Sequence, residues 1–251
     1  MSKFSYKEVA KEQGWSFEKN SPEVEYSSNY NYYKAVVSEI KPTTKMLDIG
    51  CGSGEKACKY YGLANQIVMI DNEEEMIKRA LQNNEKFNND KIRKKFIIEL
   101  GDCLGGFKYK DQYFDLVVSR HCGANMKEVF RVLKDGGIFI SEDIDHTDCL
   151  ELKDYFGRGQ GFENLKNNDI EKKILFNECI DIGFSKIEIL NFNYIEYYPN
   201  KEQLKYLLTH TPILGYFNEE DDLILDRYIK DNMTEKGIKL IRRLYAYKII
   251  K

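Results

Sequence analysis

Short apolar runs alternate with longer segments of helical periodicity along the first 150 residues of the chain. The apolar runs have the length and continuous hydrophobicity of strands buried on both faces, and they lie at 45–49, 66–70, 96–100 and 113–119, with a fifth run starting at residue 138. The segments between them carry apolar residues on one helical face, at 55–62, 72–87 and 126–133. This alternation predicts an α/β fold with a doubly wound, mostly parallel sheet.

The second half of the chain completes the sheet and adds helices that a doubly wound core does not need. The pattern predicts a helix over 170–182, a sixth strand over 184–192 and a seventh over 240–250. The tyrosine-rich stretch 27–40 is read as a further helix, closed by Pro42. We therefore expect three parts, which are an N-terminal helical extension at 1–43, a seven-stranded core at 44–195 and 239–251, and a small helical cap at 196–238 inserted before the last strand.

Residues 45–54, KMLDIGCGSG, place a strand directly before three glycines at alternate positions. Glycine permits positive φ and lets a ligand approach the main chain, and a helix that follows directs free N–H groups at that ligand. The dinucleotide motif G-x-G-x-x-G needs a glycine where this chain has Glu55. Asp48, near the end of the strand, is placed to reach a cationic ligand group. The stretch thus indicates a nucleotide-type site that departs from the dinucleotide pattern.

The second strand also ends in an acid, Asp71. An acid at the carboxyl end of the strand beside a glycine loop is placed to accept hydrogen bonds from both ribose hydroxyls of a nucleoside, as in other doubly wound folds. We therefore expect Asp71 to bind a ribose.

These motifs, in this order, resemble the class I S-adenosylmethionine-dependent methyltransferases. The first motif of that family is a hydrophobic strand, an Asp and G-x-G-x-G, as in 45–54. Its pattern D-x-x-x-x-M-x-x-x-A is matched by Asp71, Met76 and Ala80, and its segment E-x-x-R-V-L-K-P-G-G is matched by residues 128–137, with Asp135 in place of the proline. The resemblance implies a Rossmann-like methyltransferase fold, an enzyme that transfers a methyl group, and S-adenosyl-L-methionine as its cofactor.

The resemblance also implies roles for single residues. Asp48 would face the amino acid part of the cofactor, Asp71 its ribose and Asp102 the adenine amine, with the side chain beside Asp102 on the ring. The cofactor-binding residues implied in this way are Asp48, Gly50, Cys51, Gly52, Gly54, Asp71, Asn72, Met76, Asp102, Cys103 and Ser119.

Composition and charge limit the kinds of partner that the protein is expected to bind. A length of 251 residues suits one main α/β core. The net charge of −3 disfavours a protein that wraps a nucleic-acid backbone. The polar start and the lack of a long apolar run predict a cytoplasmic protein without a membrane segment. We expect a monomer or a homodimer.

The six cysteines form no C-x-x-C pair and are read as free, packed thiols. The stretch SRHCGAN (119–125) lacks the carboxylates of a metal site, so no metal is expected.

Methyl transfer is an in-line displacement that depends chiefly on alignment, so a base is optional. His121, directly after the fourth strand, is the candidate base, and Arg120 is a candidate partner for a carboxylate substrate. The cap makes the layout similar to small-molecule methyltransferases such as those acting on aconitate-like acids. We therefore expect O- or N-methylation of a small molecule at a hydroxyl, amine or carboxylate. The candidate substrate residues are Tyr33, Arg158, Tyr197, Tyr198 and His210.

Two other functions stay open at this point. The tyrosines at 26, 30, 32 and 33 either pack over the sheet edge or line a substrate entrance, and their capacity to stack on bases favours an RNA or tRNA methyltransferase. The acidic balance and the lack of an added RNA-binding module oppose that alternative. A non-catalytic binding module is the third possibility, and no sequence feature supports it.

Overall fold

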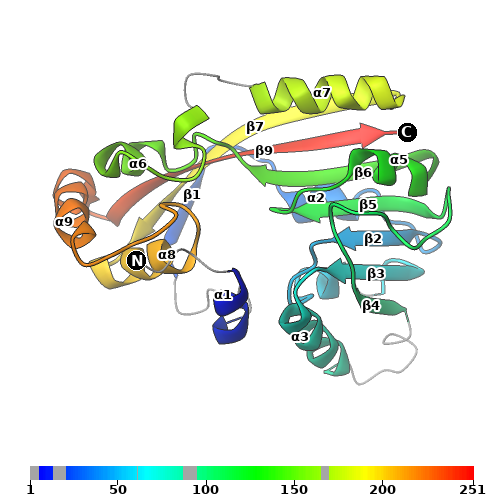
Figure 1. The fold of residues 1–251 in the computed structure, drawn as a ribbon, viewed down its shortest axis with the longest axis horizontal. Coiled ribbons are helices and arrows are strands. Elements are labelled where there is room, and N and C mark those ends of the chain that lie inside the picture. Colours follow the sequence, from blue (N-terminus) through cyan, green and yellow to red (C-terminus); the bar gives the residue numbers. More distant parts are fainter. Residues whose placement is uncertain (1–5, 14–20, 61, 87–94, 165–169) are drawn as a thin grey trace.

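The computed structural model describes residues 6–13, 21–60, 62–86, 95–164 and 170–251 (Figure 1). Within this part of the chain the strands form one mixed sheet, in the order β1-β7-β9-β6-β5-β2-β3-β4, with β8 paired to β9. The strands are β1 (Glu23–Tyr26), β2 (Lys45–Ile49), β3 (Gln66–Asp71), β4 (Phe96–Leu100), β5 (Phe114–Arg120), β6 (Leu133–Ile144), β7 (Lys186–Tyr198), β8 (Met233–Thr234) and β9 (Gly237–Ile250).

The pairing confirms the predicted α/β architecture. β4, β3, β2, β5 and β6 are parallel, and β9 runs antiparallel to both β6 and β7. All seven predicted strands occur. The described residues add β1, which pairs antiparallel with the edge of β7, and the two-residue β8.

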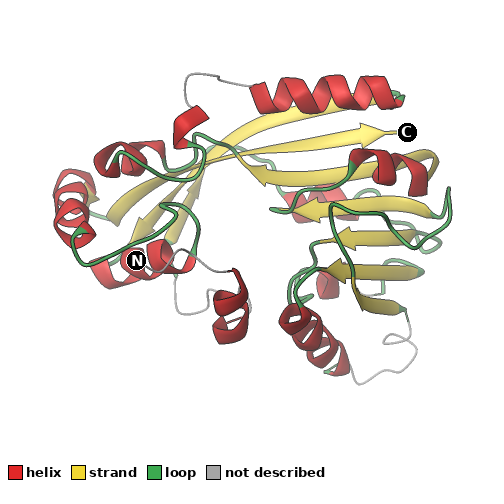
Figure 2. Cartoon of the chain, in the orientation of Figure 1, coloured by secondary structure: helices red, strands yellow, loops and turns green. Residues whose placement is uncertain are grey.

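Helices cover both faces of this sheet (Figure 2). They are α1 (Tyr6–Gln13), α2 (Tyr32–Val37), α3 (Glu74–Glu85), α5 (Met126–Val132), α6 (Leu150–Phe156), α7 (Ile170–Ile182), α8 (Lys201–His210) and α9 (Asp221–Asn232), with 3-10 turns η1 (Ala57–Tyr60) and η2 (Phe162–Asn164). One core cluster joins α5 and α7 to the sheet through residues such as Val129 and Cys179, and a second joins α2, η1 and α3 through Val36, Ala57 and Ala80. Alternate residues of the buried strands serve the two clusters.

Three local predictions were wrong. The helix expected over 27–40 is reduced to α2, because Asn31 caps it by accepting from the Lys34 N–H at 2.9 Å. The helix expected over 55–62 is only the 3-10 turn η1. The helix expected to reach residue 133 ends at Val132, and Leu133 already pairs with Phe114 in the sheet.

β7 extends beyond its predicted end at residue 192, and β9 begins before its predicted start at residue 240. Additional helices pack against these extended parts. The two strands pair continuously from Lys186 and Ile250 to Tyr198 and Ile238. α6, α8 and α9 pack there around a third core cluster that includes Tyr198 and Leu240. The arrowheads of β2, β3 and β5 point to the side of the molecule on which α8 and α9 lie (Figure 1).

Candidate functional site

The glycine loop follows β2 and turns sharply. Gly50, Gly52 and Gly54 have φ values of 69°, 55° and 74°. At Gly52 no atom lies within 4 Å of the place where a Cβ would stand, so a side chain there would project into open space above the strand ends. Gly52 therefore has the conformation and the free approach that a bound ligand needs.

Asp71, at the end of β3, holds this loop. Its Oδ2 accepts from the Gly52 N–H at 2.8 Å, and its Oδ1 accepts from the Glu73 N–H at 3.0 Å. Burial raises the pKa of Asp71, and the backbone hydrogen bonds oppose that rise. The predicted ribose acceptor thus also fixes the glycine turn.

Asp48 is a buried carboxylate that has no hydrogen-bond partner among the described residues. Burial, and then the nearby charge of Asp71, raise its pKa to about 7. A buried carboxylate in this position gains from a cationic partner, because the partner offsets the loss of solvation. The amino group of an amino acid would supply such a partner.

The other predicted cofactor residues divide between surface and interior. Asn72 and Asp102 are exposed, and Asp102 accepts from the Leu104 N–H at 2.9 Å. Cys51 and Cys103 are buried beside the glycine loop. Met76 and Ser119 lie in the interior, with 1% and 0% of their surface exposed, so they belong to the core that supports the site. These roles stay predictions.

A second cluster lies at the carboxyl ends of β5 and β6, where Arg120 and Glu142 are register partners. Arg120 donates from Nε to Glu142 Oε1 at 2.7 Å, and His121 Nε2 lies 3.5 Å from the same oxygen. The His121 N–H also donates to the Glu142 carbonyl at 2.8 Å. Glu142 is 6% exposed, whereas the side chains of Arg120 and His121 are 33% and 36% exposed. A buried carboxylate therefore holds a cation and an imidazole that both reach solvent.

Electrostatics favour a neutral imidazole in this cluster. Burial lowers the pKa of His121, and its hydrogen bond to Glu142 opposes that shift only in part. Burial would raise the pKa of Glu142, but hydrogen bonds and charge from His121 and Arg120 outweigh it and leave that pKa lowered. At neutral pH the cluster consists of an ionised Glu142 and a His121 that is free to take up a proton.

Tyrosines from the α2 region close one side of this cluster. Tyr32 donates from its hydroxyl to the Ser119 carbonyl at 2.9 Å, and the Arg120 guanidinium lies 5.9 Å from the Tyr32 ring. The Tyr30 ring packs on Phe192 at 4.8 Å, and its buried hydroxyl has no hydrogen-bond partner within the described part of the chain. Tyr33 stacks on Tyr60 at 5.5 Å. Tyr26, in the edge strand β1, lies 5.6 Å from the Tyr194 ring, so each of the four tyrosines has an aromatic or hydrogen-bonding contact within the described residues.

Comparison with known proteins identifies the family. The sequence model of the methyltransferase domain matches residues 40–209, which is more than half of the chain. The chain belongs to this family. Membership confirms the prediction of a methyl-transferring enzyme with S-adenosyl-L-methionine as its cofactor, while the aconitate-like subtype is not tested by the match.

Individual relatives of this methyltransferase domain are distant. An uncharacterised protein of Methanocaldococcus jannaschii, MJ1252, is 29% identical over 168 residues, which cover 64% of this chain and 61% of the relative. The sterol 24-C-methyltransferase erg6 of Aspergillus fumigatus is 29% identical over 143 residues, covering 51% of this chain and 37% of that enzyme. The matched regions thus span less than two thirds of either relative.

Solved structures share the fold. The YcgJ protein of Bacillus subtilis covers 88% of this chain over 97% of its own length, with a TM-score of 0.57 and 17% identity. Phosphoethanolamine N-methyltransferase 2 of Haemonchus contortus, solved with S-adenosyl-L-methionine, matches 99% of this chain over 60% of its own length, with a TM-score of 0.56 and 16% identity. The Rossmann-like methyltransferase fold is therefore confirmed.

The residues present in the methyltransferase domain fit its cofactor. The cofactor's cationic amino group suits the unpartnered carboxylate of Asp48, and its ribose hydroxyls suit Asp71. The open space at Gly52 allows the close approach that this fit requires.

Arg158 and the predicted substrate residues of the cap make no contact with the Arg120 cluster that is seen in the described residues. Arg158 pairs with Asp221 at 2.7 Å and lies 4.1 Å from the Tyr216 ring. His210 stacks on Tyr206. Tyr197 donates to Glu25 Oε2 at 3.3 Å. Tyr198 is 1% exposed and donates to Glu196, so it forms part of the interior and offers no surface to a ligand.

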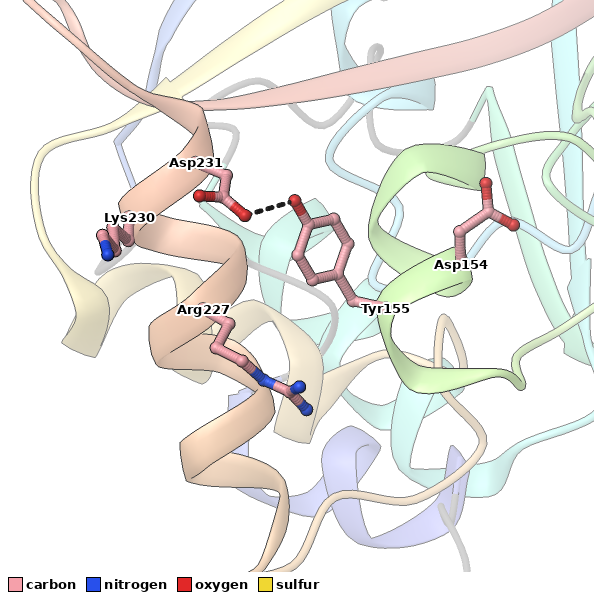
Figure 3. A pocket seen from close by; sticks show the side chains of 5 residues that line it. All are labelled: Asp154, Tyr155, Arg227, Lys230 and Asp231. Carbon is pink, nitrogen blue, oxygen red and sulfur yellow. Dashed lines mark hydrogen bonds between the residues drawn. The ribbon is translucent and has the colours of Figure 1, made fainter.

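Two depressions lie away from the glycine loop. One, of about 570 Å³, lies between α6 and α9 and is lined by Asp154, Tyr155, Arg227, Lys230 and Asp231, with the Tyr155 hydroxyl donating to Asp231 at 2.8 Å (Figure 3). The other, of about 380 Å³, lies at the ends of β6 and α7 and includes His146 and Lys172. Neither contains a residue predicted to bind cofactor.

Across the described ranges no group of three or more His, Cys, Asp or Glu side chains is arranged to hold a metal ion, and no helix has the length and apolarity needed to cross a bilayer. The cytoplasmic location and the oligomeric state stay predictions.

Sequence reasoning missed Glu142, for which no role is predicted from the sequence. Its position directly after an apolar strand is the signal that could have found it, because parallel strand ends meet at one edge.

Proposed function

We propose that this methyltransferase transfers the methyl group of S-adenosyl-L-methionine to a small-molecule acceptor held beside Arg120 and His121. The observation that carries the proposal is Glu142, whose buried carboxylate binds Arg120 at 2.7 Å and lies 3.5 Å from His121 Nε2. Because Ser119 links this cluster to the loop of Cys122 beside Gly50, the two groups stand next to the cofactor loop.

His121 is the general base in this proposal. The carboxylate of Glu142, 3.5 Å from Nε2, favours the tautomer with the proton on Nε2 and leaves Nδ1 with a lone pair for the proton of an acceptor O–H or N–H. The ionised Glu142 then stabilises the imidazolium that forms. A lowered pKa keeps His121 neutral before the reaction.

Arg120 orients the acceptor. Its Nε is taken by Glu142, and within the described residues its Nη groups have no hydrogen-bond partner. Two N–H groups in a planar fork suit a carboxylate or phosphate oxygen of the substrate. This supports an acidic acceptor, of which aconitate-like acids are one class.

The glycine loop binds the cofactor. Bound S-adenosyl-L-methionine supplies the electrophilic methyl group. Asp48 would pair with its amino group, Asp71 with its ribose, and Gly52 would leave room for it. These contacts hold one reactant in place while Arg120 holds the other, which is the main source of rate in an in-line displacement.

The charge of the chain and the packing of its tyrosines support a small acceptor over RNA. The net charge of −3 and the engagement of Tyr30, Tyr32 and Tyr33 in contacts within the chain leave little that would bind RNA. We further propose that the cap, residues 196–238, covers the acceptor and excludes water from it. The clustering of α8 and α9 with α6 supports a separate packing unit there.

A labelling screen tests the proposal. Purified protein is incubated with methyl-labelled cofactor and either a metabolite extract or total RNA. We expect label in the metabolite fraction, concentrated in acids. Label confined to RNA would overturn the small-molecule assignment in favour of the RNA alternative.

A further inference from the structure

The depression of about 380 Å³ at the ends of β6 and α7 is lined mainly by polar side chains. Its volume falls within the roughly 300 to 1,000 Å³ that small-molecule sites commonly have. Three neighbouring chain segments form its floor, because the Asp145 N–H donates to the Arg243 carbonyl at 3.0 Å and Arg243 is the register partner of Asn193. Asn191, from β7, and Lys172, from α7, also line it.

This depression lies on the other face of the sheet from the proposed acceptor. Side chains of one strand alternate between its two faces. Tyr245 packs against the core cluster that α5 and α7 cover, so Arg243, two residues before it on β9, faces the same side. Val118 belongs to the cluster that α2 covers, so Arg120, two residues after it on β5, faces the opposite side. A ligand in the depression is therefore separated from Arg120 by the sheet.

The charged side chains around the depression are paired with one another. Lys172 Nζ lies 2.7 Å from Asp145 Oδ2, and Arg243 donates from Nη1 to Glu151 Oε2 at 2.9 Å. Arg243 also donates to the Thr147 carbonyl at 3.1 Å. An ionic ligand would have to compete with these pairs, because each charge already has its partner.

His146 brings a buried imidazole nitrogen to the depression. The residue is 8% exposed, and its Nε2 has no hydrogen-bond partner among the described residues. The carboxylate of Asp145, 3.4 Å from Nδ1, favours the tautomer with the proton on Nδ1. Nε2 is then an acceptor, and a buried acceptor without a donor costs free energy. A ligand hydroxyl that donates to Nε2 removes this cost.

Two amides on β7 supply further neutral hydrogen-bonding groups. The exposed side chain of Asn191 makes no hydrogen bond within the described part of the chain. Asn193 accepts at Oδ1 from the Ser27 hydroxyl, which leaves its NH₂ group to donate. Amides and hydroxyl groups both donate and accept hydrogen bonds, so the two kinds of group are complementary.

We propose that this depression is a binding site for a small neutral molecule with several hydroxyl groups, such as a polyol or a monosaccharide. One hydroxyl donates to His146 Nε2, and others exchange hydrogen bonds with the amides of Asn191 and Asn193. The paired charges favour such a neutral ligand over an anion or a cation. The site is separate from the methyl acceptor, and its assignment does not rest on the proposed function.

Saturation-transfer NMR tests this site with glycerol, D-ribose and D-glucose as probes. The full-length protein is first saturated with S-adenosylhomocysteine, because a sugar could otherwise occupy the place of the cofactor ribose. We expect saturation transfer to at least one of these probes, and neither acetate nor inorganic phosphate should displace it. Absence of transfer to all three probes overturns the proposal. A probe that S-adenosylhomocysteine or the anions displace also overturns it, because that probe binds elsewhere or in place of an ion.

Two variants locate the bound probe. His146→Phe removes Nε2 and keeps a ring of similar size, and Asn191→Leu removes an amide of similar size from the rim. Each should weaken binding of the probe about tenfold or more, as expected for the loss of a strong hydrogen bond, and leave the affinity for S-adenosylhomocysteine unchanged. Asn65→Leu, at an exposed residue just before β3, is the matched control and should bind the probe as the wild type does.

Wild-type affinity for the probe in the Asn191→Leu protein overturns the proposal, even where the His146→Phe protein fails to fold. An equal loss of affinity in the Asn65→Leu control overturns it as well, because the effect would then not depend on the depression.

Discussion

Glu142 Oε1 lies 3.5 Å from His121 Nε2, although His121 follows β5 and Glu142 belongs to β6. The parallel register of these strands makes the contact, because it sets Arg120 beside Glu142 and leaves His121 to turn back over the carboxylate with a φ of 55°. A left-handed conformation is unfavourable for a histidine and is maintained here by the hydrogen bond from its N–H to the Glu142 carbonyl. The relationship gives His121 a fixed orientation and one free ring nitrogen.

Asp71→Ala should weaken S-adenosylhomocysteine binding by roughly 1 to 3 kcal/mol, because a charged acceptor is lost both to the ribose and to the Gly52 N–H. Titration calorimetry measures the change. Glu99→Ala, on the neighbouring strand β4 and outside the predicted site, is a control for the loss of a carboxylate. Unchanged affinity of the Asp71 variant would remove this residue from the site.

Gly52→Val should reduce the same affinity more than Asp71→Ala does, since a branched side chain would fill the open space at Gly52. Gly136→Val is the matched control, because Gly136 also has a positive φ, of 72°, and open space, but lies in β6 between the paired residues Leu133 and Ile138. Both variants should lose stability in thermal denaturation through backbone strain, and only the Gly52 variant should lose affinity. Equal affinities for the two variants would contradict the placement of the ligand.

Replacing Asp48 by Asn should have opposite effects on the stability of the protein and on its affinity for the cofactor. Its pKa is raised from 3.8 to about 7, so the folded state holds a proton that the unfolded state has lost between these values, and stability falls as the pH rises through this window. Asp48→Asn should therefore stabilise the free protein at pH 8 and give a smaller gain toward pH 4. Denaturant titrations at several pH values measure this difference.

The same variant should bind cofactor more weakly at pH 8, because the amide cannot pair with the amino group. In the wild-type protein, affinity should increase as the pH rises through about 7 and Asp48 ionises. Parallel pH profiles for the wild-type and Asp48→Asn proteins would argue against a contact between Asp48 and the cation.

The ion pair between Arg158 and the buried Asp221 provides a test of the role proposed for the cap. Arg158→Met leaves Asp221, which is 5% exposed, without its 2.7 Å ion pair and should destabilise the protein by roughly 1 to 3 kcal/mol. Arg227→Met, at an exposed residue of α9 that lines the depression beside α6 (Figure 3) and has no hydrogen bond or ion pair in the described ranges, is the matched control and should be close to neutral. If the cap covers the acceptor only, the Arg158 variant keeps its cofactor affinity. A large loss of that affinity would show that 196–238 has another role.

The sequence predicted those elements that have a strong local signal. The buried parallel strands are continuous apolar runs, and Asp48, Asp71 and the glycines are fixed by their place at the strand ends. β1, EVEY, was missed because it is short, polar and largely exposed at the sheet edge. β7 was predicted too short because its later half alternates polar and aromatic residues, a pattern that makes sense only once its pairing with β9 is known. The pairing of Glu142 with Arg120 depends on the order of β5 and β6 in the sheet, which the position of Glu142 after an apolar run does not by itself give.

The cofactor half of the site was therefore more predictable than the acceptor half. One continuous motif supplies the glycine loop, whereas the proposed acceptor half combines Arg120 and His121 from the end of β5 with Glu142 on β6. Sequence reasoning placed Tyr198 at the substrate, but the structure places it in the interior of the cap, because its strand continues into the third core cluster.

The most direct test of the central claim compares wild-type protein with His121→Gln at saturating cofactor. The measured quantities are the initial rate of label transfer from methyl-labelled S-adenosyl-L-methionine into the metabolite fraction and, in parallel, the affinity for S-adenosylhomocysteine. A base that removes the acceptor proton contributes about 100-fold or more, so the account predicts a rate at least that much lower in the variant with nearly unchanged affinity. An unchanged rate in the His121→Gln protein would contradict the role assigned to the His121–Glu142 pair.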